Sequence, residues 1–216
     1  MSIARRVDKL LARLAAMREP RPSARRWLVV AGDSLCTGRA PSMLRHMLRG
    51  VGADVGVVRA ARGGTAARHL CALVERCGRQ ELPGSVAAVI ILAGGNDARR
   101  ECAPTKETIA ASLYRCLDEI AVQWPEASAI LCTVPIPGRH PALRADAPAI
   151  LASLINPSIR QVAHTRGAVL CDLETVFEGS PGARSDGVHP TASGDRLLAE
   201  KWFQAVWPRL TRATEP

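Results

Sequence analysis

Short, unbroken apolar runs alternate along the chain with longer segments in which apolar residues recur every three to four positions. The short runs predict strands that are buried on both faces, and the longer segments predict amphipathic helices. Strands are expected over residues 27–31, 55–60, 86–93, 129–134 and 168–171. Helices are expected over residues 41–48, 66–77, 106–123, 150–165 and 192–207. This alternation predicts an α/β domain whose parallel sheet is covered by helices on both faces.

The first 26 residues carry a different pattern, with eight basic and two acidic residues that supply +6 of the net charge of +9. Their apolar residues have the spacing of one helical face. These residues are Ile3, Val7, Leu10, Leu11 and Leu14. A linker with two prolines follows over residues 19–23, so we divide the chain into a basic helix with its linker over 1–22 and one domain over 23–216. Residues 1–18 are expected to bind an anionic membrane, to dock on a partner protein or to pack on their own domain.

Composition limits the classes of function. No apolar run reaches the roughly 18 residues of a membrane-spanning helix, and the N-terminus lacks the apolar core of a secretory signal, so a cytoplasmic location is expected. The seven cysteines are irregularly spaced without a CxxC pair, which favours reduced, buried thiols over a zinc or redox centre. We expect no cofactor and no metal. Aromatic residues make up only 3% of the chain, so nucleic-acid binding is not expected either.

Four segments rich in glycine and polar residues follow expected strands. They are residues 32–35 (GDSL), 62–65 (RGGT), 94–97 (GGND) and, after the last strand, 186–190 (DGVHP). In open α/β sheets the ligand crevice lies beyond the carboxyl ends of the strands, where the strand order reverses. If the sheet has the order 2-1-3-4-5, the first strand lies between the second and the third. Ser34, Gly63 and Asn96 then come together from three neighbouring loops.

These segments resemble the motifs of the GDSL/SGNH hydrolase family, whose name gives its Ser, Gly, Asn and His. All four have matches here, in the family's order, within residues 27–207. The resemblance implies a three-layer α/β/α sandwich with a five-stranded parallel sheet, a flavodoxin-like arrangement. The family often shows SGxT at the glycine, which points to Gly63, with Gly64 as the alternative. Arg62 replaces the serine of that motif, which makes the mouth of the site more basic.

The resemblance also implies a serine hydrolase that cleaves carboxylic esters or thioesters through an acyl-serine intermediate. Ser34 is then the nucleophile and His189 the base that takes its proton, since an unperturbed histidine titrates near pH 6.5. Asp186 accepts the other ring N–H and fixes the tautomer. The oxyanion hole is formed by the backbone N–H groups of Ser34 and Gly63 and the side-chain amide of Asn96.

Other interpretations of these residues remain open. Ser34 could instead cap a helix, and Cys36 is a rival nucleophile, although a small buried thiol is the simpler account of it. His140 lies in a proline-rich loop and receives no role. The same site could transfer the acyl group to an alcohol, or the chain could be a non-catalytic adaptor that acts through its basic helix.

The expected partner is a small-molecule acyl ester or thioester, and we expect short acyl chains to be preferred. Long chains need an extended apolar groove, because each buried CH₂ contributes about 0.8 kcal/mol. The longest insertion, residues 135–148, is polar and basic, and the site loops supply few large apolar groups. They supply Arg39, Arg62, Arg99 and Arg100 instead. Such a mouth suits a small acyl group on a polar or anionic carrier.

Overall fold

Five parallel strands form one sheet in the computed structural model, which describes residues 26–80, 82–180 and 182–212. The strands are β1 (Arg26–Gly32), β2 (Val55–Ala61), β3 (Ser85–Leu92), β4 (Ser128–Cys132) and β5 (Val169–Cys171). They pair in the order β2-β1-β3-β4-β5, and each pair is parallel. The expected sheet is confirmed. Its order reverses at β1, which places the switch point between the loops that follow β1 and its two neighbours.

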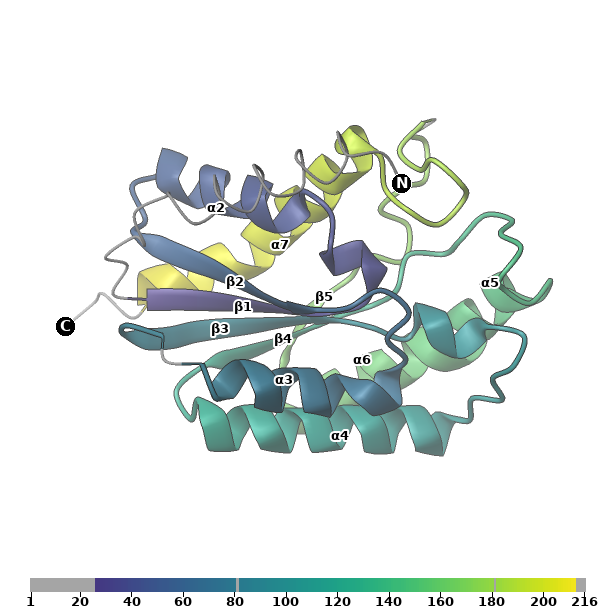
Figure 1. The fold of residues 1–216 in the computed structure, drawn as a ribbon, viewed down its shortest axis with the longest axis horizontal. Coiled ribbons are helices and arrows are strands. Elements are labelled where there is room, and N and C mark those ends of the chain that lie inside the picture. The colour runs from purple at the N-terminus through teal and green to yellow at the C-terminus, as the bar shows by residue number, and fades with distance from the viewer. Residues whose placement is uncertain (1–25, 81, 181, 213–216) are drawn as a thin grey trace, which may run out of the picture.

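Helices cover both faces of the sheet and complete the three-layer sandwich. The α-helices of the described residues are α2 (Ala40–Gly50), α3 (Leu70–Gly78), α4 (Lys106–Gln123), α5 (Ala147–Ile150), α6 (Asn156–Arg166) and α7 (Ala192–Arg212). Figure 1 shows α2 and α7 together on one face and α3, α4 and α6 on the other. The strands all point towards the same edge, so the loops that follow them gather there.

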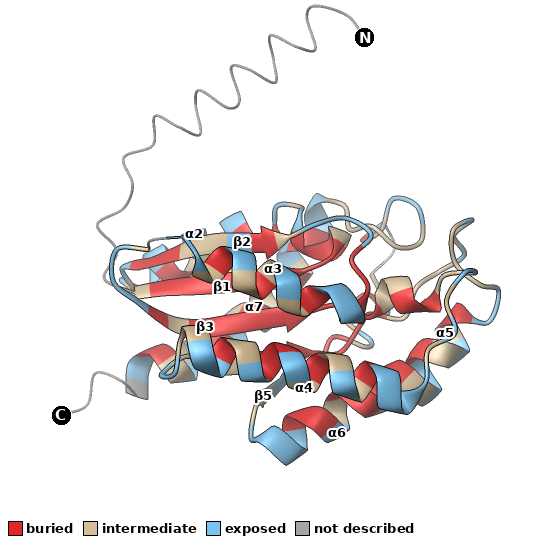
Figure 2. Cartoon of the chain, turned by 60° about the horizontal axis from the view of Figure 1, so that its bottom comes forward, coloured by how far each residue is buried: buried red, intermediate tan, exposed pale blue. Residues whose placement is uncertain are grey.

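The central strands β1 and β3 are enclosed by helices on both faces of the sheet. Leu28, Val29 and Val30 of β1 are fully buried, and so is Val89 in the middle of β3. Figure 2 shows β1 and β3 almost wholly buried, whereas the long helices alternate between a buried and an exposed face. Burial of apolar surface, at roughly 25 cal/mol per Å², is the main stabilising contribution here. The loops at the carboxyl edge therefore start from a fixed frame.

Two helices begin differently from the sequence expectation. The segment 66–77 begins as a short 3₁₀ turn ahead of α3, and the segment 150–165 begins with a π-helical turn, Leu151–Ile155, between α5 and α6. Directly after the π-helical turn, the buried amide of Asn156 accepts the backbone N–H of Val134 at 2.7 Å and donates to the Val134 carbonyl at 2.9 Å. This pairing ties the start of α6 to the chain that leaves β4.

No helix within the described residues is long and apolar enough to span a membrane. The basic helix expected within residues 1–22, and with it the domain boundary at residue 23, lies outside the described residues. The described part of the domain consists of the sheet, the helices on its two faces and the loops that connect them.

Candidate active site

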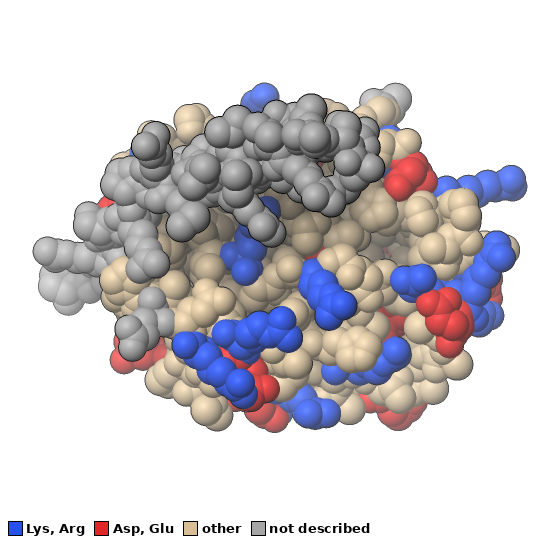
Figure 3. Space-filling model, in the orientation of Figure 1, with Lys and Arg blue, Asp and Glu red and all other residues tan. Residues whose placement is uncertain are grey.

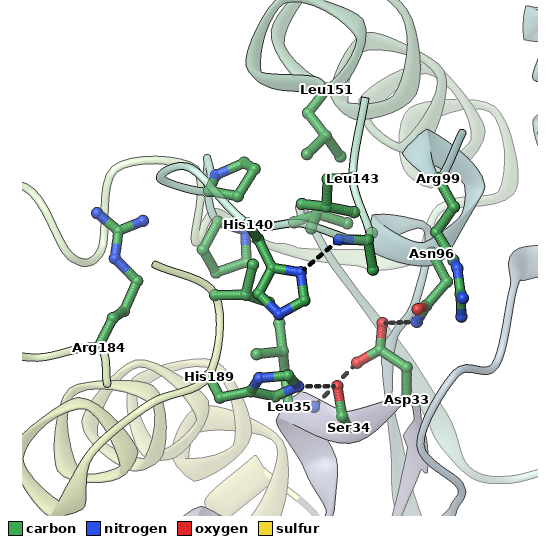
Figure 4. A pocket seen from close by; sticks show the side chains of 16 residues that line it. Asp33, Ser34, Leu35, Asn96, Arg99, His140, Leu143, Leu151, Arg184 and His189 are labelled. Carbon is green, nitrogen blue, oxygen red and sulfur yellow. Dashed lines mark hydrogen bonds between the residues drawn. The ribbon is translucent and has the colours of Figure 1, made fainter. Parts of the chain in front are cut away.

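Ser34 stands where β1 ends and a short 3₁₀ turn, Ser34–Cys36, begins. Asp33 caps this turn, because its Oδ1 accepts the backbone N–H of Leu35 at 3.0 Å. The backbone N–H of Thr37 donates to the Ser34 carbonyl at 3.2 Å and closes the turn. The interpretation of Ser34 as a helix cap is therefore wrong, since Asp33 holds that position and the Ser34 hydroxyl is left to point away from the turn (Figure 4).

Ser34, His189 and Asp186 form a continuous chain of hydrogen-bonding groups. Nε2 of His189 lies 3.0 Å from Oγ of Ser34, a contact drawn in Figure 4, and Nδ1 of the same ring lies 2.7 Å from Oδ2 of Asp186. A neutral imidazole that donates from Nδ1 to the carboxylate presents a free lone pair at Nε2. That lone pair is aimed at the serine hydroxyl, so the ring is placed to take up its proton.

The carboxylate of Asp186 is held by the turn that carries it. Its Oδ1 accepts the backbone N–H groups of Val188 at 3.0 Å and His189 at 2.8 Å. Burial raises the pKa of Asp186, but the hydrogen bonds from His189 and Val188 outweigh burial and keep this pKa well below its usual range. Gly187 makes the turn possible, since its φ is +86° and a Cβ there would come within 2.6 Å of the Arg139 carbonyl oxygen.

Gly63 rather than Gly64 lies beside the serine. A Cβ built on Gly63 would meet Cβ of Ser34 at 3.9 Å, whereas a Cβ on Gly64 would meet the guanidinium of Arg99. Within the described residues, the backbone N–H groups of Ser34 and Gly63 donate to no other group. Two backbone donors are thus available next to the hydroxyl of Ser34.

The side-chain amide of Asn96 completes this corner of the site. It sits on a 3₁₀ turn after β3, and its Nδ2 donates to Oδ2 of Asp33 and to the Thr65 carbonyl, both at 3.2 Å. Asp33 is only 2% exposed, and burial raises its pKa to about 6, although hydrogen bonds from Leu35 and Asn96 lower it. Sequence patterns assign Asp33 no role beyond its place in the GDSL motif. Its signal was an aspartate at the end of an apolar strand, where a buried carboxylate must find donors.

His140 was also missed. Its ring lines the cavity next to Ser34 and meets the ring of His189 edge-on, with centroids 5.9 Å apart and planes at 74° (Figure 4). Its Nδ1 accepts the backbone N–H of Ala142 at 3.2 Å, and its Nε2 lies 3.6 Å from Oδ2 of Asp186. A lone histidine in a proline-rich loop carries no sequence signal for such a contact, because the contact exists only once the loop folds back.

Two alternative chemistries find little support in the geometry. Cys36 is fully buried, and burial raises the pKa of its thiol well above the ordinary value, so it is not a rival nucleophile. In the described part of the chain, His140, Asp186 and His189 are the group whose ligand atoms lie close enough together for a metal ion, within 4.8 Å. Their nitrogen and oxygen atoms, however, already face one another or Ser34. A hydrogen-bond network accounts for the group.

A cavity of about 60 Å³ opens beside Ser34. Its apolar walls are Leu35, Val134, Pro135, Pro137, Ala142, Leu143, Leu151 and Val188. Figure 4 shows Leu143 and Leu151 at the end far from Ser34, with Arg99 and Arg184 on opposite sides. The space next to the hydroxyl is therefore mostly apolar, with two leucine side chains at the end far from Ser34.

The sequence profile of the GDSL-like Lipase/Acylhydrolase family matches residues 29–197. The chain belongs to this family. The match includes the loops that carry Ser34, Gly63, Asn96 and His189, so the resemblance drawn from those loops is confirmed. A comparison with curated protein sequences gives no match.

Solved structures share the fold of this GDSL-like chain at low sequence identity. An inhibitor-bound aryl esterase from M. smegmatis superposes with a TM-score of 0.73 at 17% identity, over 85% of this chain and 99% of that one. A carbohydrate acetylesterase from Sinorhizobium meliloti gives 0.72 at 14% identity over the same shares. A psychrotrophic esterase from Pseudoalteromonas sp., inhibited by monoethylphosphonate, gives 0.67 at 16% identity over 86% and 98%. These likenesses establish the fold of the chain across nearly the whole length of each neighbour.

Proposed function

We propose that this GDSL-like protein hydrolyses carboxylic esters or thioesters through an acyl-serine intermediate at Ser34. The observation that carries the proposal is the hydrogen-bonded chain itself, with 3.0 Å between Ser34 Oγ and His189 Nε2 and 2.7 Å between His189 Nδ1 and Asp186 Oδ2. This is the arrangement that turns an unreactive hydroxyl into a nucleophile. Family membership supports the same class of reaction.

The reaction proceeds in two halves. Oγ of Ser34 attacks the ester carbonyl while Nε2 of His189 takes the hydroxyl proton, and the carboxylate of Asp186 stabilises the imidazolium that results. Collapse of the tetrahedral intermediate breaks the bond to the leaving group, which receives the proton from His189. A water molecule then attacks the acyl-serine with His189 again as base and releases the carboxylic acid.

The oxyanion is stabilised by three donors in this proposal. Two are the unused backbone N–H groups of Ser34 and Gly63, and the third is the side-chain amide of Asn96. Both N–H groups of that amide already donate, one to Asp33 and one to the Thr65 carbonyl, so Asn96 reaches the oxyanion by sharing or exchanging one of these hydrogen bonds as charge develops. The two backbone donors are free and oriented in advance, so they require no reorganisation when charge develops.

The cavity supports a preference for short acyl groups. Leu143 and Leu151 lie at the end of the cavity far from Ser34, where they limit the length of an acyl chain that extends in that direction. An aryl esterase and a carbohydrate acetylesterase share the fold, which makes acetyl esters the first substrates to try. Figure 3 shows Lys and Arg side chains spread over the face of the molecule seen there. Arg62 and Arg100 are exposed among the site loops, which favours a polar or anionic carrier for the acyl group.

A panel of p-nitrophenyl acetate, butyrate, octanoate and palmitate, with matching thioesters, tests this function. We expect kcat/KM to be highest with acetate and activity to disappear in Ser34→Ala, while Ser42→Ala, an exposed serine on α2, serves as the matched control. A fluorophosphonate should label Ser34. Full activity in Ser34→Ala, or labelling at another residue, would contradict the proposal. Faster transfer to an added alcohol than to water would identify an acyltransferase instead.

A further inference from the structure

The carboxylate of Asp186 lies between two imidazole rings, and the proposed reaction uses only one of them. Oδ2 of Asp186 accepts from Nδ1 of His189 at 2.7 Å and faces Nε2 of His140 at 3.6 Å. Oδ1 is already occupied by two backbone N–H groups. A carboxylate offers about four lone-pair sites, two on each oxygen. Oδ2 therefore has one site left, and His140 is the group that faces it.

The backbone sets the tautomer of His140. Because Nδ1 accepts the N–H of Ala142 at 3.2 Å, the proton of the neutral ring resides on Nε2. The ring thus presents a donor, and not a lone pair, to the carboxylate of Asp186. The same tautomer disfavours metal binding at Nε2. A metal ion there would require the ring proton to move to Nδ1, where it would face the N–H of Ala142.

Two contacts fix the loop that carries His140 against the turn that carries Asp186. The backbone N–H of Gly138 donates to the Gly187 carbonyl at 2.7 Å, and the Arg184 guanidinium donates to the Ile136 carbonyl at 2.5 Å. Gly138 allows the close approach, since a Cβ there would come within 3.2 Å of Cα of Gly187. The side chain of His140 is only 21% exposed. Its position is therefore set by packing and does not depend on a flexible surface loop.

The geometry points to His140 as a positioning residue, whose Nε2–H donates to Asp186 and holds that carboxylate in line with the ring of His189. The inference rests on the proposed function, because Asp186 must first be the partner of His189. The contact of 3.6 Å is long for a hydrogen bond, but such contacts at active sites often shorten only when the substrate binds. The orientation of the Asp186 carboxylate matters most when His189 carries the serine proton, because the carboxylate then stabilises the imidazolium. Loss of the His140 contact should therefore lower kcat.

Two substitutions separate the N–H of His140 from its ring. His140→Phe keeps a flat ring against His189 and removes the donor, whereas His140→Gln keeps an N–H near the same position and removes the ring. We expect His140→Phe to lower kcat for p-nitrophenyl acetate about ten-fold, the effect of losing one hydrogen bond to a charged group, with KM within about two-fold. His140→Gln should restore most of kcat. His164→Phe, at an exposed position on α6, is the matched control and should leave both constants unchanged.

The outcomes are distinct. A wild-type kcat in His140→Phe, or equal losses in the Phe and Gln variants, would overturn the positioning role and leave the proposed function intact, because Ser34 would still react with a fluorophosphonate. A wild-type protein that neither hydrolyses acyl esters nor is labelled would overturn both. Thermal unfolding of each variant identifies one that fails to fold; His140→Leu then replaces the donor-free Phe variant, or His140→Asn the donor-bearing Gln variant.

Discussion

Replacement of Asn96 by alanine removes one donor of the proposed oxyanion hole without touching Ser34 or His189. In the structure, Nδ2 of Asn96 contacts Oδ2 of Asp33 and the Thr65 carbonyl, and it adjoins the cavity next to the serine hydroxyl. The amide cannot help to bind the ester strongly in its ground state, because the carbonyl oxygen gains its charge only as the serine attacks. The substitution should therefore act on kcat far more than on KM.

The size of the effect follows from two separate losses. Loss of one oxyanion donor typically lowers kcat by about 10²–10³, which is about 2.7–4 kcal/mol in the transition state. The fold also loses a hydrogen bond to the buried carboxylate of Asp33, which costs about 1–3 kcal/mol of the free energy of unfolding. The same loss should raise the pKa of Asp33 further above about 6, since the Asn96 hydrogen bond lowers it.

Steady-state kinetics with p-nitrophenyl acetate and urea unfolding measure the two losses independently. The other asparagine of the chain, Asn156, supplies a matched control, because its buried amide also makes two hydrogen bonds, both to Val134. Asn156→Ala should lower the free energy of unfolding by a similar amount and reduce kcat far less. A kcat for Asn96→Ala within about three-fold of wild type, or a rise in KM alone, would remove Asn96 from the oxyanion hole.

Three further predictions address the cavity, the buried carboxylate and the buried thiol. Leu151→Ala should open the far end of the cavity and raise kcat/KM for octanoate relative to acetate in the ester panel; an unchanged ratio would mean that the acyl chain lies elsewhere. The pKa of Asp33 is raised from 3.8 to about 6, so the folded state binds this proton more tightly than the unfolded chain does. The stability that this proton contributes is fully present below about pH 3.8 and is lost as the pH rises through about 6. In urea unfolding between about pH 4 and 7, wild type should lose up to about 3 kcal/mol relative to Asp33→Asn, and parallel pH profiles would refute this. Cys36→Ala should keep the activity of wild type. If iodoacetamide inhibited wild type but not Cys36→Ala, Cys36 would again be a candidate nucleophile.

The fold could be predicted because its signals are local. The apolar runs of β1 and β3 are long enough to identify buried strands, and polar motifs follow directly at their carboxyl ends. Only the ends of elements moved, as where a π-helical turn precedes α6. The buried amide of Asn156 is bound to Val134 there, and sequence periodicity carries no information about a pairing between residues that far apart.

The main residues of the candidate site could be predicted for a related reason. A hydroxyl, an imidazole and a carboxylate in a known order identify a chemistry, and Ser34, His189 and Asp186 do lie together. The support around them could not be predicted. His140 reaches Asp186 only because two glycine-containing loops pack closely, and the role of Asp33 depends on how completely its carboxylate is buried. Such contacts arise from tertiary packing, which a single motif does not encode.

Asp33 shows why a buried carboxylate, which is usually unfavourable, occurs directly after β1. A carboxylate enclosed beneath a strand end costs free energy unless donors reach both of its oxygens. Leu35 supplies a donor to Oδ1 and Asn96 supplies one to Oδ2, so the same carboxylate that caps the serine turn also holds the amide of the oxyanion hole. An apolar residue at position 33 would avoid the cost of burial, but it would leave the turn uncapped and the amide held by Thr65 alone. The raised pKa of Asp33 thus reflects the cost of burying a carboxylate whose hydrogen bonds orient the Ser34 turn and the Asn96 amide.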